Sequence, residues 1–310
     1  MKVLYFGDPR AALGLIESTE YQVKLCGLVH GRSGGEGAQK LASTIRNGPY
    51  HDLPRWQLPN LNDPSIVQAI SQTKPDLIVS VFFPRLIPQT ILDLAPGINV
   101  HPSDLPKWRG PDPSFWVISQ RESETAISIH SLTAKLDEGD IIYKERVKVR
   151  PRESGGALAV RLERQSAQLM VDYLQRLSQT PKWRSQLVGI PQTGETTWAP
   201  LMEPDDLEVD WGLTANRVDA FVRAAAPDPC AFSGLGHELM IIHRGRVAHL
   251  SRPMNGQEQS LVPVGQALID EERCLIRCGE GFYQLDEVTI GRRRVRGVQL
   301  AQLLGGLLTR

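Results

Sequence analysis

The sequence has no apolar run of the roughly 18 residues that a membrane-spanning helix requires. Its first seven residues, MKVLYFG, are too short an apolar run for a secretory signal and resemble a buried strand. Neither charge is in excess, because 35 Lys and Arg residues balance 35 Asp and Glu residues. Strong nonspecific attraction to nucleic acid is therefore not expected of the whole chain, although a local basic patch is compatible with it. We expect a cytoplasmic protein with no membrane partner.

Cysteine is scarce, with four residues in 310. Cys274 and Cys278 have the spacing of half a metal site, but two further ligands at comparable spacing are not nearby. We therefore expect structural thiols and predict no metal site.

The order of apolar patterns predicts an α/β fold. Runs of strand length alternate with segments of helical spacing; the predicted strands are 2–6, 23–29, 76–82 and 97–100, and the predicted helices are 9–18, 65–73 and 88–94. Such alternation indicates a doubly wound, mostly parallel, Rossmann-like sheet. Two longer strands, 125–132 and 140–149, and a long amphipathic helix, 154–177, follow.

The pattern changes in the last third of the chain. Residues 181–204 are rich in Pro, Thr and Gly, which is typical of a connection between domains. Short strands at close spacing then predict a small, OB-like β barrel. The predicted domains are thus residues 1–180 and 205–310, joined by the linker 181–204, and the sequence does not predict an oligomeric state.

The first candidate site lies at the end of the predicted strand 97–100. Asn99 and His101 are two residues apart, so on an extended strand their side chains leave the same face. Asp137, in a later loop, can bring a carboxylate to that pair. An amide, an imidazole and a carboxylate together can stabilise an oxyanion and move a proton, which is what acyl transfer requires.

The segments around these residues resemble one enzyme family. INVHPSDLPKWRG (98–110) together with KLDEGDI (135–141) resembles the folate-dependent formyltransferases, and the joint motif is specific. Later segments, residues 209–229 and the closing GEGFYQLDEV (279–288), look like that family's carboxyl-terminal barrel. The resemblance covers nearly the whole chain.

This resemblance implies a set of functional residues. Asn99, His101 and Asp137 match the family's catalytic positions, and the implied co-substrate is 10-formyltetrahydrofolate. The amide and an imidazole N–H would bond the formyl oxygen, while Asp137 would accept a proton through a water or raise the pKa of His101. Within FFPRLIP (82–88), Arg85, Leu86 and Ile87 match positions of the pterin pocket, to which Asp137 would also contribute.

Each of these residues has a simpler structural interpretation. Asn99 could form a strand-end turn, and His101 could be a loop residue held extended by the following proline. Asp137 could serve merely to fold its own turn by bonding its backbone, because the neighbouring Glu138 and Asp140 are competing candidates for the carboxylate. Residues 82–88 could be a plain strand-to-helix turn.

The formyl acceptor is harder to predict. The segment after Arg109–Gly110, with Asp112 and Trp116, looks more like the amino-sugar formyltransferases than the methionyl-tRNA enzymes. Asp112 could hold an ammonium and Trp116 could face a sugar, while Ser103 and Arg109 could touch the substrate or hold the loop. The loop 31–40 is only weakly basic, which argues against tRNA. We therefore expect a small-molecule amine acceptor, a nucleotide-linked amino sugar or another specialised small amine, narrowly preferred to methionyl-tRNA.

The sequence is also compatible with other functions. Four arginines within residues 292–296 could contact phosphates, or could be a solvated rim of the barrel. A formyltetrahydrofolate hydrolase would use the same site with water as the acceptor. A nucleotide-binding dehydrogenase would also explain a doubly wound sheet, but the first strand lacks the glycine-rich motif GxGxxG.

Overall fold

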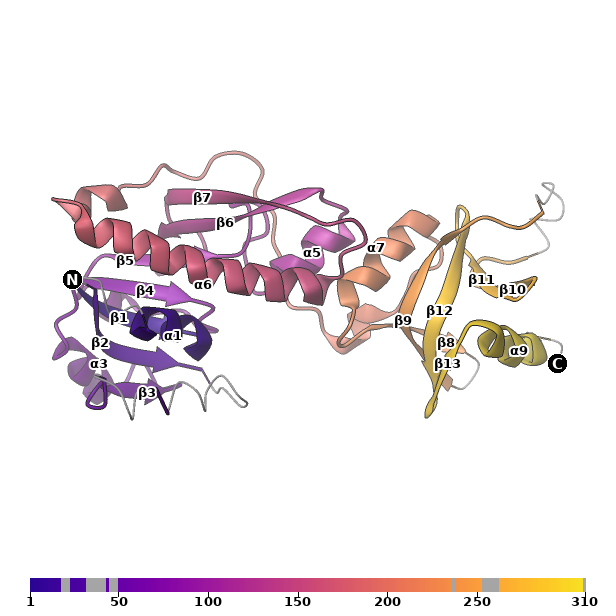
Figure 1. Cartoon of the computed structure of the whole chain (residues 1–310), viewed down its shortest axis with the longest axis horizontal. Coiled ribbons are helices and arrows are strands. Elements are labelled where there is room, and N and C mark those ends of the chain that lie inside the picture. Colours follow the sequence, from indigo (N-terminus) through magenta and orange to yellow (C-terminus); the bar gives the residue numbers. More distant parts are fainter. Residues whose placement is uncertain (18–22, 32–42, 45–49, 236–237, 253–261, 309–310) are drawn as a thin grey trace. The chain divides into compact units, whose positions relative to one another are not determined.

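The computed structural model describes residues 1–17, 23–31, 43–44, 50–235, 238–252 and 262–308. Its contacts divide the chain into two compact units (Figure 1). The amino-terminal unit comprises residues 1–113, 124–148 and 160–200, and the carboxyl-terminal unit comprises 114–123, 149–159 and 201–310. Most of the segment predicted as a linker, up to residue 200, therefore groups with the amino-terminal unit. The predicted loop 31–40 lies almost wholly outside the described residues.

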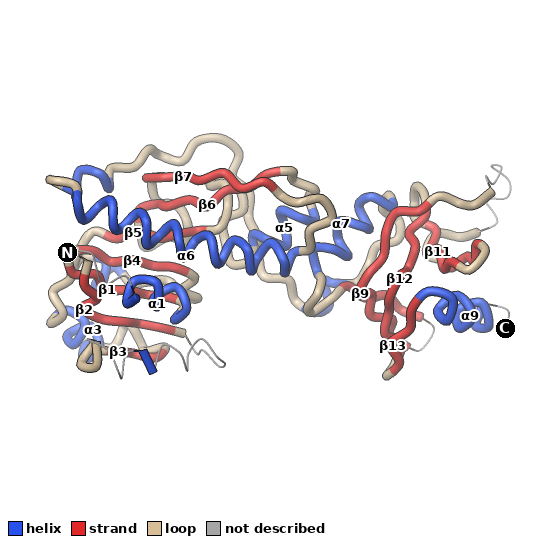
Figure 2. The backbone as a smooth tube through the Cα atoms, in the orientation of Figure 1, coloured by secondary structure: helices blue, strands red, loops and turns tan. Residues whose placement is uncertain are grey.

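The amino-terminal unit is built on a seven-stranded sheet in the order β3-β2-β1-β4-β5-β6-β7. Its strands are β1 (Lys2–Gly7), β2 (Lys24–His30), β3 (Arg55–Gln57), β4 (Leu77–Val81), β5 (Gly97–His101), β6 (Glu124–Ser131) and β7 (Ile141–Lys148). The strands β1 to β5 pair in parallel, whereas β6 pairs antiparallel with both β5 and β7. Figure 2 shows these strands side by side. The predicted mostly parallel sheet is confirmed, and β3 is a strand that the sequence pattern did not predict.

Helices cover this sheet. They are α1 (Pro9–Glu17), α3 (Pro64–Ser71), α4 (Gln89–Leu92) and most of α6 (Gly155–Gln179). The start of α3 is set locally, because Asp63 accepts the backbone N–H of Ser65 at 2.8 Å and Pro64 occupies the first helical position.

The core of this unit lies between the sheet and its helices. Every residue of β4 is buried, as expected for a central strand covered on both faces. Side chains from three strands and two helices meet there, among them Leu4, Phe6, Val29, Ile70, Ile78 and Ile91. Each such side chain contributes roughly 1.5–3 kcal/mol by leaving water, which fixes the strand ends that carry the candidate site.

The carboxyl-terminal unit contains a six-stranded antiparallel sheet. Its main path runs β10-β11-β12-β9-β8, and β13 pairs with β12. The strands are β8 (Ala231–Leu235), β9 (Glu238–Ala248), β10 (Ala267–Asp270), β11 (Arg273–Arg277), β12 (Phe282–Ile290) and β13 (Arg293–Arg296). The prediction of a second, β-sheet domain after the α/β unit is confirmed as an antiparallel sheet, to which helices are added.

Helices α7 (Ala215–Ala225) and α9 (Gly297–Leu308) pack on this second sheet, and α5 (Pro113–Ser119) falls mostly in the same unit. Short 3₁₀ turns occupy Trp183–Leu187 and Pro204–Leu207. Cys274 and Cys278 are buried, and burial raises the pKa of each thiol to about 12. Within the described ranges, every helix is too short or too polar to cross a bilayer.

Candidate functional site

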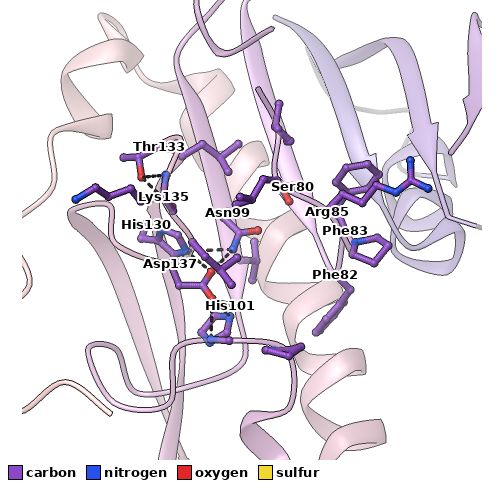
Figure 3. A pocket seen from close by; sticks show the side chains of 18 of the residues that line it. Ser80, Phe82, Phe83, Arg85, Asn99, His101, His130, Thr133, Lys135 and Asp137 are labelled. Carbon is purple, nitrogen blue, oxygen red and sulfur yellow. Dashed lines mark hydrogen bonds and ion pairs between the residues drawn. The ribbon is translucent and has the colours of Figure 1, made fainter. Parts of the chain in front are cut away.

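Asn99, His101 and Asp137 lie together at the end of β5 (Figure 3). The amide nitrogen Nδ2 of Asn99 donates to Oδ1 of Asp137 at 3.3 Å. The ring nitrogen Nδ1 of His101 lies 3.6 Å from the other carboxylate oxygen, Oδ2. The carboxylate thus contacts both side chains at once, and His101 and Asp137 are each only 5% exposed. The structure thus brings together the three side chains that the sequence analysis expected to meet.

The loop that carries Asp137 is tightly constrained. Asp137 has a φ of 53°, a left-handed conformation that is uncommon outside glycine. A Cβ on Gly139 would lie 1.8 Å from the Ser131 carbonyl oxygen, so only glycine fits there. The backbone N–H of Gly110 donates to Oδ2 of Asp137 at 3.0 Å. These constraints hold the carboxylate in place before any substrate binds.

Gln192 joins two loops of the site and was not predicted from the sequence. Its Nε2 donates to the carbonyl oxygens of Asp137 and Gly139, each at 2.8 Å. Its Oε1 accepts from Nε and Nη2 of Arg109, at 3.1 and 2.7 Å. A single amide therefore ties the Asp137 loop to the Arg109 loop, and Gln192 acts as a positioning residue.

His130 is a second group that sequence reasoning missed. It faces Asn99 in the β5–β6 register and is 2% exposed. Its Nδ1 is 2.9 Å from the Ser131 carbonyl, which can only accept, so we assign the ring proton to Nδ1. Nε2 is then free to accept from Asn99 Nδ2 at 3.0 Å. Both amide hydrogens of Asn99 are thereby oriented, one toward His130 and one toward Asp137.

The charges of the site follow from its burial. Burial lowers the pKa of His101, and although Asp137 and the Trp108 carbonyl act in the opposite direction, the net shift is downward. Burial alone would raise the pKa of Asp137, but His130, His101 and the Gly110 N–H together hold it below its usual value. The pair is therefore a neutral imidazole beside an ionised carboxylate near pH 7. The sequence-based idea that Asp137 raises the pKa of His101 is correct in sign, but burial outweighs it.

The hydrogen bonds also assign the tautomer of His101. Nε2 lies 3.0 Å from the carbonyl oxygen of Trp108, so Nε2 carries the proton. Nδ1 is then an unprotonated nitrogen 3.6 Å from an anionic oxygen. A proton that arrives at Nδ1 would be stabilised by that carboxylate, which is the arrangement of a general base.

We expect the imidazole of His101 to titrate below 6.5, the ordinary histidine value, because burial disfavours its charged form. Replacing Asp137 with asparagine should lower this pKa further, since the carboxylate stabilises the imidazolium. Two-dimensional ¹H–¹⁵N NMR of the ring nitrogens against pH measures both values. A His101 pKa above 6.5, or one that rises in Asp137→Asn, would contradict this electrostatic description.

A cavity of about 460 Å³ opens beside the three residues. Asn99, His101, His130 and Asp137 form part of its wall, and the segment 82–87 forms another part (Figure 3). Its size lies within the usual range of small-molecule sites, roughly 300–1,000 Å³. Most of the exposed surface lining it is apolar. The cavity can therefore hold a partly apolar small molecule against the polar cluster.

The three residues predicted to bind a pterin all line this cavity. Ile87 is buried, whereas Leu86 is 55% exposed and presents apolar surface at the cavity. Arg85 directs its Nη1 toward the carbonyl oxygen of Pro59 at 3.3 Å.

The four residues predicted for the acceptor do not line the cavity. Ser103 is fully buried and donates its hydroxyl to the Lys107 carbonyl at 2.8 Å, which is a structural role within the loop. The guanidinium of Arg109 bonds Gln192 and lies 3.6 Å from Glu138. Asp112 is partly buried, and its backbone N–H donates to the carbonyl oxygen of Ala199. Trp116 lies on α5, where its ring contacts the ring of Phe115.

Two family models match the chain. The model described as formyl transferase matches residues 8–174, and the model of the formyl transferase carboxyl-terminal domain matches residues 201–303. Together they match most of both compact units.

Known proteins similar to this chain include methionyl-tRNA formyltransferases. That of Thermosynechococcus vestitus is 30% identical over 327 aligned residues, covering 97% of this chain and 96% of its own. That of Alkaliphilus oremlandii is 28% identical, covering 96% and 95%.

Solved structures share the fold at low sequence identity. An N-formyltransferase from Helicobacter canadensis, in complex with folinic acid and dTDP-3-aminofucose, superposes with a TM-score of 0.65 at 13% identity, covering 93% of this chain and 100% of its own. HypX from Aquifex aeolicus superposes with a TM-score of 0.59 at 19% identity over the whole of this chain. The chain spans about half of HypX, 48% of its length.

Proposed function

The chain belongs to the formyl transferase family, and from this premise we propose that it moves a formyl group from 10-formyltetrahydrofolate to a primary amine. One observation carries the proposal beyond family membership. An amide, a neutral imidazole and an ionised carboxylate share one wall of a cavity large enough for a small-molecule co-substrate. The co-substrate would supply the formyl carbon. The chain's own residues would bind and orient the reactants and would move a proton.

We assign the first role to Asn99. When an amine attacks a formyl carbon, the carbonyl oxygen gains negative charge, and a hydrogen-bond donor aimed at that oxygen lowers the barrier. Asn99 has one amide hydrogen held by His130 at 3.0 Å and one directed at Asp137 over a longer 3.3 Å. The second, weaker contact is the one that a formyl oxygen would replace.

His101 and Asp137 would handle the proton. The attacking nitrogen must lose a proton as its bond to carbon forms, and the folate nitrogen must gain one as the old bond breaks. Nδ1 of His101 can accept that proton, and the carboxylate 3.6 Å away stabilises the resulting charge. The same nitrogen can return the proton to the leaving folate nitrogen, so the cycle needs no external acid or base.

The cavity residues 85–87 would bind the co-substrate. Replacing the exposed Leu86 with alanine should raise KM for 10-formyltetrahydrofolate about tenfold with kcat nearly unchanged, because apolar contact to a bound ring is lost equally in ground and transition states. Val188→Ala is the matched control, since Val188 is 79% exposed and lies outside the cavity. An unchanged KM in Leu86→Ala would remove that side chain from the binding site.

Methionyl-tRNA is the acceptor that we favour. Sequence similarity to methionyl-tRNA formyltransferases extends over 95% or more of the chain, including the carboxyl-terminal unit. This similarity supports the tRNA acceptor better than the small amine expected from residues 110–116 alone. The second candidate remains a nucleotide-linked amino sugar, supported by that segment and by the fold shared with the Helicobacter enzyme.

An acceptor screen tests the proposal. The protein is given 10-formyltetrahydrofolate with methionyl-tRNA, with a nucleotide-linked amino sugar or with no acceptor, and release of tetrahydrofolate is followed spectroscopically. We expect release that depends on methionyl-tRNA. Release with the amino sugar alone would transfer the assignment to the second candidate, and equal release without any acceptor would indicate a hydrolase instead.

A further inference from the structure

Trp198 is a large aromatic side chain that the proposed mechanism does not use. It is 50% exposed, and it is the largest of the exposed apolar side chains in the described ranges. Within the parts of the chain that the structure describes, its indole N–H has no hydrogen-bond acceptor and its ring has no aromatic or cationic partner. An isolated exposed apolar side chain is common on protein surfaces, so the interest of Trp198 lies in its position.

Backbone hydrogen bonds hold Trp198 beside the loop that carries Arg109. The Thr197 carbonyl accepts the N–H of Arg109 at 3.1 Å, and the N–H of Ala199 donates to the Arg109 carbonyl at 2.7 Å. These bonds form a short parallel bridge between Arg109 and Trp198. Neighbouring side chains on an extended segment point to opposite sides, so the fully buried Ala199 faces inward and Trp198 faces outward. The backbone that carries the indole is thus fixed before a ligand binds.

The indole ring lies against the wall of the formyl-transfer cavity. A Cβ added to Gly110 would lie 3.5 Å from Cε2 of Trp198, in ordinary contact with the ring. Gly110 lines the cavity, and its N–H donates to Oδ2 of Asp137 at 3.0 Å. A single residue therefore separates the exposed ring from the carboxylate of the site. Pro111, which also lines the cavity, is exposed, so the cavity reaches the protein surface beside the ring. All these residues belong to the amino-terminal unit.

Both candidate acceptors carry an aromatic base near the amine that is formylated. In methionyl-tRNA the amino acid is esterified to the ribose of the terminal adenosine, and in a nucleotide-linked amino sugar a diphosphate joins the sugar to a nucleoside. When the amine reaches a formyl carbon beside Asn99, the base stays outside at the edge of the cavity. Bases stack on exposed aromatic side chains, and indole offers a wide face for this contact.

We propose that Trp198 is a stacking platform for the nucleobase of the formyl acceptor. This platform rests on the proposed function, because it requires an acceptor whose amine enters the cavity. Since methionyl-tRNA is the favoured acceptor, the base assigned to the platform is its terminal adenine, and the base of a nucleotide-linked amino sugar is the other outcome of the test. Trp198 contributes to binding of the acceptor and takes no part in the movement of the proton.

Equilibrium binding tests the platform without formyl transfer. The chain has six tryptophans, so ¹⁵N labelling of the full-length protein gives six indole N–H signals, and Trp198→Phe identifies the signal of Trp198 by its loss. The probes are 3′-deoxy-3′-(methionylamino)adenosine, which carries the free amine and the adenine, and the same compound without the base. We expect only the probe with adenine to shift the Trp198 signal, at concentrations up to about 10 mM. Equal shifts by the two probes, or none by either, would overturn the proposal.

Formyl-transfer kinetics provide the second measurement. Trp198→Ala should raise KM for methionyl-tRNA about tenfold with kcat nearly unchanged, because stacking is lost equally in the ground and transition states. Trp198→Phe should keep KM within about threefold of the parent value, since a smaller aromatic face remains. Trp183→Ala is the matched control, because Trp183 belongs to the same unit and does not line the cavity. Equal KM values in Trp198→Ala and Trp183→Ala would overturn the proposal.

The two measurements separate the platform from the proposed function. Formyl transfer with a parental KM in Trp198→Ala would overturn the platform and leave the proposed function intact. Without transfer to any acceptor, the proposed function fails, and the platform stands or falls by the base-dependent shift of the indole signal. A raised KM in Trp198→Ala for a nucleotide-linked amino sugar alone would assign the platform to the base of that acceptor.

Discussion

Replacing Asp137 with asparagine is expected to lower kcat for formyl transfer at least about 100-fold with the fold intact. The substitution preserves the size of a side chain that is 5% exposed and keeps an oxygen for the Gly110 N–H. It removes the negative charge that lies 3.6 Å from Nδ1 of His101. Without that charge the imidazole is a weaker base, and a proton on it is no longer stabilised. Single-turnover rates measure the effect, and thermal unfolding confirms that the variant is folded.

The neighbouring carboxylate provides the control for this variant. Glu138 is 42% exposed at its side chain and contacts Lys135 and Arg109 at 3.4 and 3.6 Å, away from His101. Glu138→Gln should therefore change kcat by less than about threefold, since its pair with Lys135 is exposed and contributes little, and Gln192 still holds Arg109. A rate for Asp137→Asn close to that of the parent protein would remove Asp137 from the mechanism. Equal losses in the two variants would mean that the general charge of the loop matters rather than one carboxylate.

The local pattern of the sequence predicted the elements that carry the site. The buried run at β4 and the two-residue spacing of Asn99 and His101 depend only on strand periodicity, which is visible in a few consecutive residues. Asp137 was predicted through its family motif, because nothing in the LDEGD segment itself distinguishes it from Glu138 or Asp140. The structure provides the distinction: Asp137 is the residue at a φ of 53° that points inward to two histidines.

His130 and Gln192 could not be predicted in the same way. His130 becomes part of the site only because the register of β5 and β6 sets it opposite Asn99, and register is a long-range property. Gln192 lies in a segment whose Pro, Thr and Gly content suggested a simple connection. It reaches Arg109, 83 residues earlier, and Asp137, 55 residues earlier, through side-chain hydrogen bonds that leave no local pattern.

The direction of the His101 pKa shift could not be predicted from the sequence motif either. A carboxylate next to a histidine suggests a raised pKa, and the motif alone gives no measure of burial. In the folded chain His101 is 5% exposed, and desolvation exceeds the attraction of Asp137. The result favours an imidazole that starts the reaction neutral and accepts a proton, over one that starts charged and donates one.

Replacing Asn99 with alanine is expected to lower kcat at least about 100-fold, because the variant loses the amide donor that the formyl oxygen would use. His130→Phe should cost less, roughly tenfold, since it removes the acceptor that orients one amide hydrogen and a 3.5 Å contact with Asp137 but leaves the Asn99 donor itself in place. Stopped-flow measurement of folate release under single-turnover conditions separates these effects on the chemical step from effects on product release.

The double variant decides between two explanations of the His130 effect. If His130 acts only by positioning Asn99, then adding His130→Phe to Asn99→Ala should cause no further loss, because the side chain that it orients is already absent. A further tenfold loss in the double variant would instead assign His130 an independent role, and its 3.5 Å contact with Asp137 would be the place to seek it. A near-normal rate in Asn99→Ala would remove the amide from the mechanism and leave His101 and Asp137 to carry the chemistry alone.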